Sequence, residues 1–331
     1  MSREIVVNGR FLSRLVTGVE RHGREIVRWM GDRCRVEKTR VNSAAGHAWE
    51  QFILPRTLNS NSVLWSPANT GPLWVQNQAL TIHDLSPLEH PEWFRASFSL
   101  WYRLFLPVLA KRVRVVFTPS EHVKRKITKR FGITNVIVAP NGVDTSVFHP
   151  EARQRIQGLP KKYILFVGSL QPRKNLGLLL NAWDELKGEF ADTWLLIAGS
   201  PGSVFGKVKF RLGERTHRLG YIPEDALPGL YAHSECLVLP SLDEGFGLPA
   251  LEAMACGTAV LVSDGGALPE VVGHAARVFP LSEPRELKRW LKECLSNPDL
   301  RWSLKEAGLM RARQFSWQTT ADLVWKTLHE L

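Results

Sequence analysis

Two adjacent cations, Arg173 and Lys174, stand in a loop between a predicted strand and a predicted helix, within the segment GSLQPRKN at 168–175. Positive side chains at the start of a helix oppose the helix dipole, so this position is unfavourable unless an anion binds there. Backbone amides at a helix start favour phosphate groups. The segment therefore predicts a diphosphate site, and the alternative is a solvated Arg-Lys pair on a loop.

A second segment, PSLDEGFGLPALE at 240–252, carries the two carboxylates Glu244 and Glu252. Carboxylates accept hydrogen bonds from sugar hydroxyls, and Gly245 and Gly247 allow the backbone to approach a ligand closely. Ligands of open α/β sheets bind at the carboxyl ends of the strands. The segment therefore predicts sugar binding, and the alternative is a turn followed by an ordinary carboxylate near the start of a helix. A third segment, SDGGALPE at 263–270, also follows a predicted strand.

Other motifs that carry chemistry are missing from the sequence. No GxGxxG follows the first predicted strand of either half, and GxxxxGK[ST], HExxH, GxSxG and EF-hand patterns do not occur. Dinucleotide dehydrogenases and P-loop enzymes are therefore disfavoured. The pair His83-Asp84 is too small to indicate a metal site. We expect no metal and no cofactor.

Short apolar runs and amphipathic stretches alternate along the whole chain of 331 residues, a length typical of about two domains. Predicted strands cover 4–8, 63–66, 79–83, 113–119, 135–139, 163–168, 194–199, 236–240 and 259–263. Predicted helices cover 18–30, 47–58, 97–112, 120–131, 176–187, 248–256, 284–295, 300–314 and 317–331. This alternation predicts parallel, doubly wound α/β sheets. Turn residues at 141–142 and 149–150 predict a linker between two of them.

Composition and charge narrow the class of protein. The four cysteines form no CxxC pair, which fits a reducing cytoplasm. No run approaches the ~18 apolar residues that span a bilayer, and no secretory signal is visible at the N-terminus. Of the net charge of +11, residues 1–150 carry +10. The first half is therefore expected to face an anionic partner: nucleic acid, membrane headgroups or a phosphorylated substrate.

Taken together, the motifs resemble the retaining glycosyltransferases of family 4. The resemblance rests on RKN at 173–175, the E-x-F-G-x-x-x-x-E frame of Glu244 and Glu252, and the segments APNGVD (139–144), GYIP (220–223), TGVER (17–21), IHDLSPL (82–88), PEWF (91–94) and SEH (120–122). They occur in the family's order over nearly the full chain. The chain departs from many relatives at Ser169, where they carry an arginine.

The resemblance implies the GT-B fold: α/β, with two Rossmann-like doubly wound domains that face each other across a cleft. Residues 1–155 would form the acceptor-binding domain and 156–315 the nucleotide-sugar-binding domain, while a helix at about 316–331 crosses back to the first.

The resemblance also implies roles for single residues. Arg173 and Lys174 would hold the diphosphate and stabilise the leaving group, and Glu244 would contact the hydroxyls of the donor sugar. The implied catalytic residues are His83, Arg173, Lys174 and Glu244. The implied donor-binding residues are Gly18, Gly168, Ser169, Arg173, Lys174, Tyr221, Ile222, Glu244, Gly245, Phe246, Gly247, Leu248 and Glu252. The acceptor would meet His83 and Asp84, and no metal is implied.

The expected reaction is the metal-independent transfer of a hexose, with mannose from GDP-mannose as the first choice, onto a glycan or lipid-linked saccharide in cell-surface polysaccharide synthesis. The alternatives are a UDP- or dTDP-sugar donor, a nucleotide-sugar epimerase, and a basic nucleic-acid-binding protein. No recognised nucleic-acid module is visible, so no specific nucleic acid is expected as a partner.

The basic first domain is expected to dock on the inner face of the cell membrane. Cations at Arg103, Lys111, Arg112 and Arg114 lie among apolar residues, and 124–130 form a second basic helix face. The pattern makes no prediction of an oligomeric state.

Overall fold

The computed structural model describes residues 3–14, 16–41, 43–152, 156–200, 205 and 211–331. The chain forms two compact units. The first unit comprises Met1–Pro91, Ala96–Gly142 and Ser316–Leu331, and the second comprises Glu92–Arg95 and Val143–Phe315. The division falls after Gly142, whereas the boundary expected at 155 lies outside the described residues.

The first unit is built on a sheet of six parallel strands in the order β2-β1-β3-β4-β5-β6. The strands are β1 (Glu4–Asn8), β2 (Arg35–Glu37), β3 (Ser62–Ser66), β4 (Gln78–Thr81), β5 (Val115–Thr118) and β6 (Val136–Val138). The central strands β3, β4 and β5 are buried along their whole length, as parallel strands covered by helices on both faces must be.

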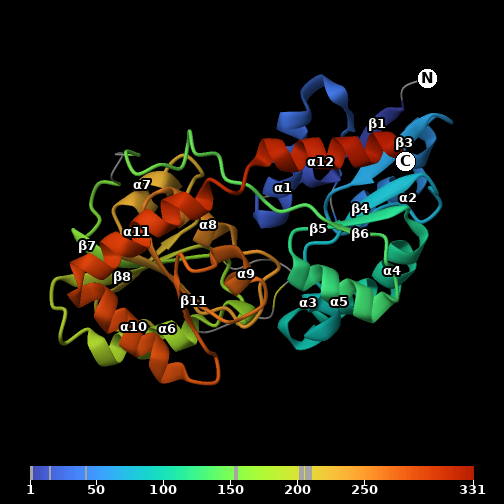
Figure 1. Cartoon of the computed structure of the whole chain (residues 1–331). Coiled ribbons are helices and arrows are strands. Elements are labelled where there is room, and N and C mark those ends of the chain that lie inside the picture. The colour runs from blue at the N-terminus through green and yellow to red at the C-terminus, as the bar shows by residue number, and fades with distance from the viewer. Residues whose placement is uncertain (1–2, 15, 42, 153–155, 201–204, 206–210) are drawn as a thin grey trace. The chain divides into compact units, whose positions relative to one another are not determined.

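Helices cover both faces of this sheet. They are α1 (Gly18–Met30), α2 (Ser43–Phe52), α3 (Ser86–Glu89), α4 (Ala96–Arg112), α5 (Glu121–Phe131) and α12 (Trp317–Glu330). Figure 1 shows α1 and α12 on one side of the sheet and α3, α4 and α5 on the other. Sequence signals fix the ends of α5: the Ser120 side chain caps its first turn, and Gly132 follows its last turn at a φ of 67°.

The C-terminal helix α12 belongs to the first unit, where it packs on α1 and over β1 and β3. The segment PNG at 140–142, where the first unit's main part ends, contacts the first turn of α12. Thr320 Oγ1 donates a hydrogen bond to the Pro140 carbonyl at 2.6 Å, and a Cβ on Gly142 would lie 2.2 Å from the Trp317 nitrogen. Only glycine lets the chain pass the start of α12 this closely.

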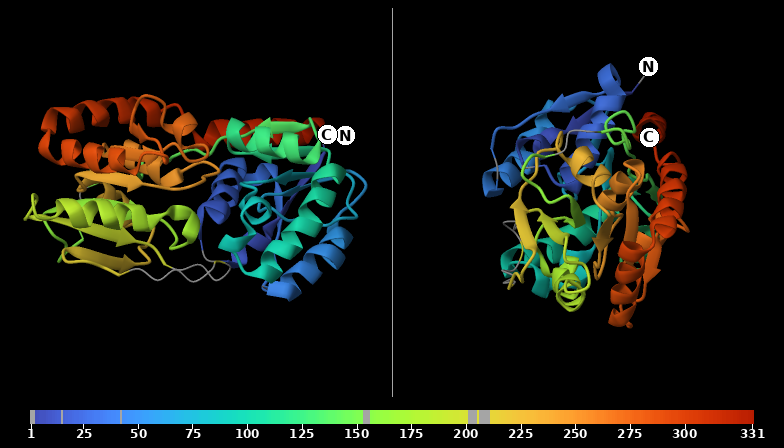
Figure 2. Two further views of the ribbon diagram at one scale, coloured as in Figure 1. Left: turned by 90° about the horizontal axis from the view of Figure 1, so that it is seen from below. Right: turned by 90° about the vertical axis from the view of Figure 1, so that its left-hand side faces the viewer.

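The second unit repeats the architecture with six parallel strands in the order β12-β11-β10-β7-β8-β9. The strands are β7 (Lys162–Val167), β8 (Thr193–Ala198), β9 (Thr216–Gly220), β10 (Cys236–Leu239), β11 (Ala259–Ser263) and β12 (Arg277–Phe279). The helices are α6 (Leu176–Leu186), α7 (Leu227–Ala232), α8 (Leu248–Ala255), α9 (Leu268–Val272), α10 (Pro284–Ser296) and α11 (Pro298–Ala312). α10 packs against α6 and runs beside α11 (Figure 2).

Three strands that the sequence did not predict, β2, β9 and β12, all lie at sheet edges. Their residues are largely half-buried or exposed, so they carry no apolar run. The helix predicted at 47–58 instead runs from Ser43 to Phe52, and a short 3-10 turn follows over Leu54–Thr57. Pro55 explains the early end, because proline cannot continue a helix from its interior. Among the described residues, no helix is long and apolar enough to cross a membrane.

We predict that Gly142→Ala destabilises the protein. The added methyl group collides with the backbone at Trp317, and overpacking of this kind costs about 1–3 kcal/mol. The loss is measured as a lower midpoint of thermal unfolding. Gly177→Ala in α6 is the matched control, since nothing lies within 4 Å of its Cβ position. Equal midpoints for the two variants would contradict this account of Gly142.

Candidate active site

Polar side chains gather in the second unit where β7, β10 and β11 end. The parallel strands bring their carboxyl ends to one edge of the sheet, and the loops that follow carry Arg173 and Lys174, Glu244, and Gly266. This edge is where open α/β sheets bind ligands. The structure therefore brings together residues that stand far apart in the sequence.

The cations Arg173 and Lys174 lie in a single 3-10 turn, Pro172–Lys174, before α6. Asn175 then adopts left-handed backbone, with a φ of 49°, and α6 begins at Leu176. The Leu242 nitrogen donates a hydrogen bond of 2.8 Å to the Arg173 carbonyl. This bond ties the loop after β7 to the loop after β10, so the cations and the carboxylate of Glu244 are held in register.

The Glu244 carboxylate lies between the two cations. Its Oε1 forms an ion pair with Lys174 Nζ, and its Oε2 lies 3.9 Å from Arg173 Nη1. The Ser241 hydroxyl donates a further hydrogen bond of 2.8 Å to Oε1. Lys174 is only 8% exposed and Glu244 only 4%. The ion pair is therefore buried, and either partner alone would be an uncompensated charge in the protein interior.

Two opposing effects act on the pKa of Glu244. Burial, the larger single effect, pushes the pKa upward, but Lys174 and Arg173 together with hydrogen bonds from Lys174 and Ser241 outweigh it and hold the pKa below its ordinary value. The carboxylate is therefore ionised at neutral pH. Two cations therefore flank this one carboxylate.

The backbone of Glu244 is held by the Gly265-Gly266 turn after β11. The Ala267 nitrogen donates a hydrogen bond of 2.8 Å to the Glu244 carbonyl. Gly266 has a φ of +70°, and a Cβ there would lie 2.3 Å from the Glu244 nitrogen. The sequence pointed to this turn as a third strand end, but the support that it and Ser241 provide to Glu244 appears only in the structure.

Glu252 lies inside α8, with 3% of its surface exposed. Its Oε2 accepts a hydrogen bond of 2.8 Å from the Tyr231 hydroxyl, which comes from α7. The intervening residues Gly245, Phe246, Gly247 and Leu248 form the loop after β10 and the start of α8, and all four are buried.

The other residues implied on the donor side follow strands of the same sheet. Gly168 and Ser169 follow β7, where the Ser169 hydroxyl accepts a hydrogen bond of 2.7 Å from Gln171 Nε2. Tyr221 and Ile222 follow the edge strand β9, and Tyr221 is 56% exposed. An exposed aromatic ring at this edge has a face available for stacking.

In the first unit, Gly18 is the first residue of α1 and is exposed. Asp84 Oδ1 accepts a hydrogen bond of 3.0 Å from the Ser86 nitrogen, as in an ordinary turn. His83 is buried, and its Nε2 lies 2.8 Å from the Pro67 carbonyl. Because a carbonyl only accepts, Nε2 carries the proton and Nδ1 is the acceptor.

A second histidine that the sequence did not suggest packs on His83. The His22 ring lies edge-on to it at 4.7 Å, and His22 Nδ1 lies 2.7 Å from Asn141 Oδ1. Burial lowers the pKa of His22 to about 3 and also lowers the pKa of His83. Both imidazoles are therefore neutral at pH 7. The only available signal was the spacing of His22 one turn after Gly18 in α1.

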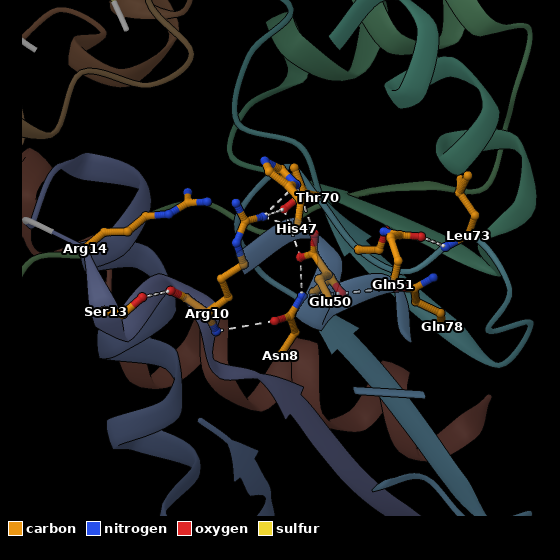
Figure 3. A network of polar contacts seen from close by, with 12 residues as sticks. Asn8, Arg10, Ser13, Arg14, His47, Glu50, Gln51, Thr70, Leu73 and Gln78 are labelled. Carbon is orange, nitrogen blue, oxygen red and sulfur yellow. Dashed lines mark hydrogen bonds and ion pairs between the residues drawn. The ribbon is translucent and has the colours of Figure 1, made fainter. Parts of the chain in front are cut away.

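The first unit also contains a buried polar network at the ends of β1 and β3 (Figure 3). Arg10 Nη1 lies 3.1 Å from Glu50 Oε2 and 3.0 Å from His47 Nδ1. Asn8 and Thr70 donate hydrogen bonds of 2.7 and 3.0 Å to Glu50 Oε1. Figure 3 shows these side chains pointing toward one another from separate elements. The positive charge of Arg10 and the negative charge of Glu50 balance each other in this network.

Among the residues that the structure describes, no group of three or more His, Cys, Asp or Glu side chains is placed to hold a metal ion.

Comparisons with known proteins identify the family. Residues 60–147 match Glycosyltransferase Family 4, and residues 150–311 match Glycosyl transferases group 1. The O-antigen chain mannosyltransferase B of Escherichia coli is 31% identical over 261 residues, which cover 75% of this chain and 68% of that protein. The chain belongs to glycosyltransferase family 4. It is a glycosyltransferase, as the ordered motifs predicted.

Two further relatives of this family 4 glycosyltransferase are informative. The serotype-specific mannosyltransferase WbdA of Escherichia coli is 30% identical over 73% of this chain, and the chain spans about a third of it, 32%. The structure of Anabaena Alr3699/HepE in complex with UDP-glucose superposes with a TM-score of 0.78 at 18% identity, over 100% of both chains. This likeness confirms the GT-B fold predicted from the sequence.

We predict that Glu244→Gln destabilises the unliganded protein, because it removes the carboxylate that forms an ion pair with the buried Lys174. Breaking a buried pair in this way costs about 3–5 kcal/mol. Since the folded-state pKa of Glu244 is lowered from 4.5, its contribution is fully present above about pH 4.5 and declines as pH falls through the lower folded value. Denaturant unfolding of both proteins at several pH values measures the difference. If the difference in the free energy of unfolding grows as the pH falls, the lowered pKa of Glu244 is wrong.

Proposed function

We propose that this chain is a retaining, metal-independent mannosyltransferase. It moves mannose from GDP-mannose onto a glycan or lipid-linked saccharide during the synthesis of cell-surface polysaccharide. The observation that carries the proposal is the buried cluster of Arg173, Lys174 and Glu244 at the carboxyl edge of the second sheet. The mannosyltransferase names of the relatives support the choice of sugar.

In this proposal the donor diphosphate binds at Arg173 and Lys174. The phosphate gains negative charge as the sugar leaves, and fixed cations in a buried site stabilise that charge more than water does. Glu244 balances part of the positive charge before the donor binds. Arg173 and Lys174 then neutralise the diphosphate, which needs no metal ion.

The sugar and the nucleoside are assigned to the residues around this cluster. Glu244 accepts hydrogen bonds from the hydroxyls of the donor sugar, supported by the loop of Gly245, Phe246, Gly247 and Leu248. Glu252 binds the ribose, and Tyr221 and Ile222 contact the base. Gly168 and Ser169 line the path of the phosphates, and Ser169 replaces the arginine of many relatives with a hydroxyl.

The first unit is assigned to the acceptor. We assign His83 and Asp84 to acceptor binding, and the Gly18 amide to the phosphates. His83 is neutral at pH 7 because burial lowers its pKa, so it acts as a hydrogen-bonding group and not as a cation. In the retaining route, the acceptor hydroxyl attacks the anomeric carbon on the face that the phosphate leaves, and a leaving phosphate oxygen accepts its proton. The reaction takes place at the cytoplasmic face of the membrane, with the basic first unit in contact with anionic lipid.

A UDP- or dTDP-sugar is the second candidate donor. The observation in its favour is the structural similarity to a protein whose structure was determined with UDP-glucose. At 18% identity this similarity informs the fold, so the named mannosyltransferase relatives weigh more in the choice of the sugar.

We predict that Lys174→Ala lowers turnover at least about a hundredfold, because one lost group that stabilises developing charge costs about 2.7–4 kcal/mol. Release of free nucleoside diphosphate in the presence of donor and acceptor measures turnover. Lys288→Ala is the control: it removes the same charge from the surface of the same unit, where Lys288 pairs with Glu185 at 2.5 Å. Near-normal turnover by a folded Lys174→Ala protein, or activity that EDTA abolishes and Mg²⁺ restores, would contradict the proposal.

A panel of nucleotides in thermal unfolding tests the choice of donor. We expect GDP and GDP-mannose to raise the unfolding midpoint, because a ligand at about 100 times its dissociation constant stabilises a protein by about 2.7 kcal/mol. UDP and dTDP should shift it little. The shift with GDP should disappear in Lys174→Ala and persist in Lys288→Ala. A shift with UDP and none with GDP would overturn the choice of GDP-mannose.

A further inference from the structure

A basic cavity of about 370 Å³ opens between α3, α4 and α5 of the first unit. It is lined by Leu88, Arg103, Pro107, Lys111, Arg130 and Phe131. Three cations surround an apolar floor, because Leu88 and Phe131 are buried while the three charged residues are exposed. None of the lining residues is acidic, so the cavity attracts an anion with an apolar part.

The cavity follows from the spacing of residues on α4. Arg103, Pro107 and Lys111 lie four positions apart and therefore share one face of the helix. The last turn of α5 adds Arg130 from the neighbouring helix. α4 contains no acidic residue that could pair with these cations.

The three cations of the cavity differ from the other basic residues nearby. Within the described parts of the chain, the side chains of Arg103, Lys111 and Arg130 form no hydrogen bond or ion pair. By contrast, Lys126 of α5 pairs with Glu89 at 2.6 Å, and Arg112 lies over the Trp74 ring at 5.4 Å. The cavity therefore concentrates charge that the protein itself does not neutralise.

An apolar stripe runs along α4 next to the cavity. Leu100, Leu104 and Val108 again lie four positions apart, one residue from the cavity face, and are 58%, 67% and 44% exposed. Trp74 is 74% exposed beneath Arg112 at the end of the same helix. Exposed apolar side chains beside unpaired cations are typical of surfaces that enter the boundary between headgroups and acyl chains.

We propose that this cavity binds the phosphate of an anionic phospholipid headgroup, while Leu100, Leu104 and Val108 enter the outer acyl region. The occupant is a lipid because only a lipid covers the apolar stripe as well as pairing with the cations. A free phosphate or a nucleic acid would leave Leu100, Leu104 and Val108 exposed to water. The inference rests on the proposed contact of the first unit with anionic membrane and names the place and chemistry of that contact.

The test compares two triple variants of the full chain by sedimentation with vesicles. Arg103→Gln, Lys111→Gln and Arg130→Gln together remove the cations of the cavity. Lys124→Gln, Arg125→Gln and Lys129→Gln remove the same charge from positions of α5 that do not line the cavity. Vesicles of phosphatidylcholine with phosphatidylglycerol are the probe, and vesicles of phosphatidylcholine alone are the control.

We expect the cavity variant to bind anionic vesicles about a hundredfold more weakly than the unmodified protein, since each basic residue at such a surface contributes about fivefold. The α5 variant should lose less than about tenfold. Leu104→Gln should also weaken vesicle binding, and all three variants should keep the thermal shift with GDP, which reports the donor site alone.

Three results would overturn the inference, each in a different way. Equal losses of vesicle binding in the two triple variants would show that the cavity is not the binding site. The contact with membrane would then be spread over the basic surface of the first unit. Equal binding of the unmodified protein to neutral and anionic vesicles would contradict both the cavity as a phosphate site and the proposed contact with anionic lipid. Stabilisation by inorganic phosphate, lost in the cavity variant, without any vesicle binding would assign the cavity to a soluble phosphate.

Discussion

The buried ion pair between Lys174 and Glu244 is the constraint on which the second unit depends. A charge taken out of water is costly unless a partner compensates it, so neither residue could occupy its position alone. Two backbone hydrogen bonds beside the pair align the loops that carry it. Leu242 donates to the Arg173 carbonyl, and Ala267 donates to the Glu244 carbonyl. The ends of β7, β10 and β11 are thereby fixed around one carboxylate.

Both sheets carry a polar cluster at the carboxyl edge, and the two clusters differ in their charged side chains. In the first unit, Arg10 and Glu50 cancel, and Asn8, His47 and Thr70 supply hydrogen bonds from the protein. That cluster links the loop after β1 to α2 and to the loop after β3. In the second unit, Arg173 and Lys174 both lie beside Glu244. The proposed anion site therefore differs from the first-unit network in having two cations beside one carboxylate.

The segment PNGV, which carries part of the family resemblance, acts as a structural element. Asn141 binds His22, which packs on His83, and Gly142 lets the chain pass the first turn of α12. A segment between the two units thus supports the surroundings of His83 and also the C-terminal helix. The family pattern pointed to these residues, but the hydrogen bond to His22 assigns them a physical role.

The sequence by itself determined the two doubly wound sheets, because buried parallel strands such as β8 and β10 carry continuous apolar runs. It also pointed to Arg173, Lys174 and Glu244, because adjacent cations at a helix start oppose the helix dipole and a carboxylate beside two glycines follows a strand. It missed β2, β9 and β12, since edge strands bury little and leave no apolar pattern. Only the tertiary structure decided that Glu244 lies between the two cations, that His22 packs on His83, and that Arg103, Lys111 and Arg130 share a cavity. These residues lie on different elements, and only the packing of those elements brings them together.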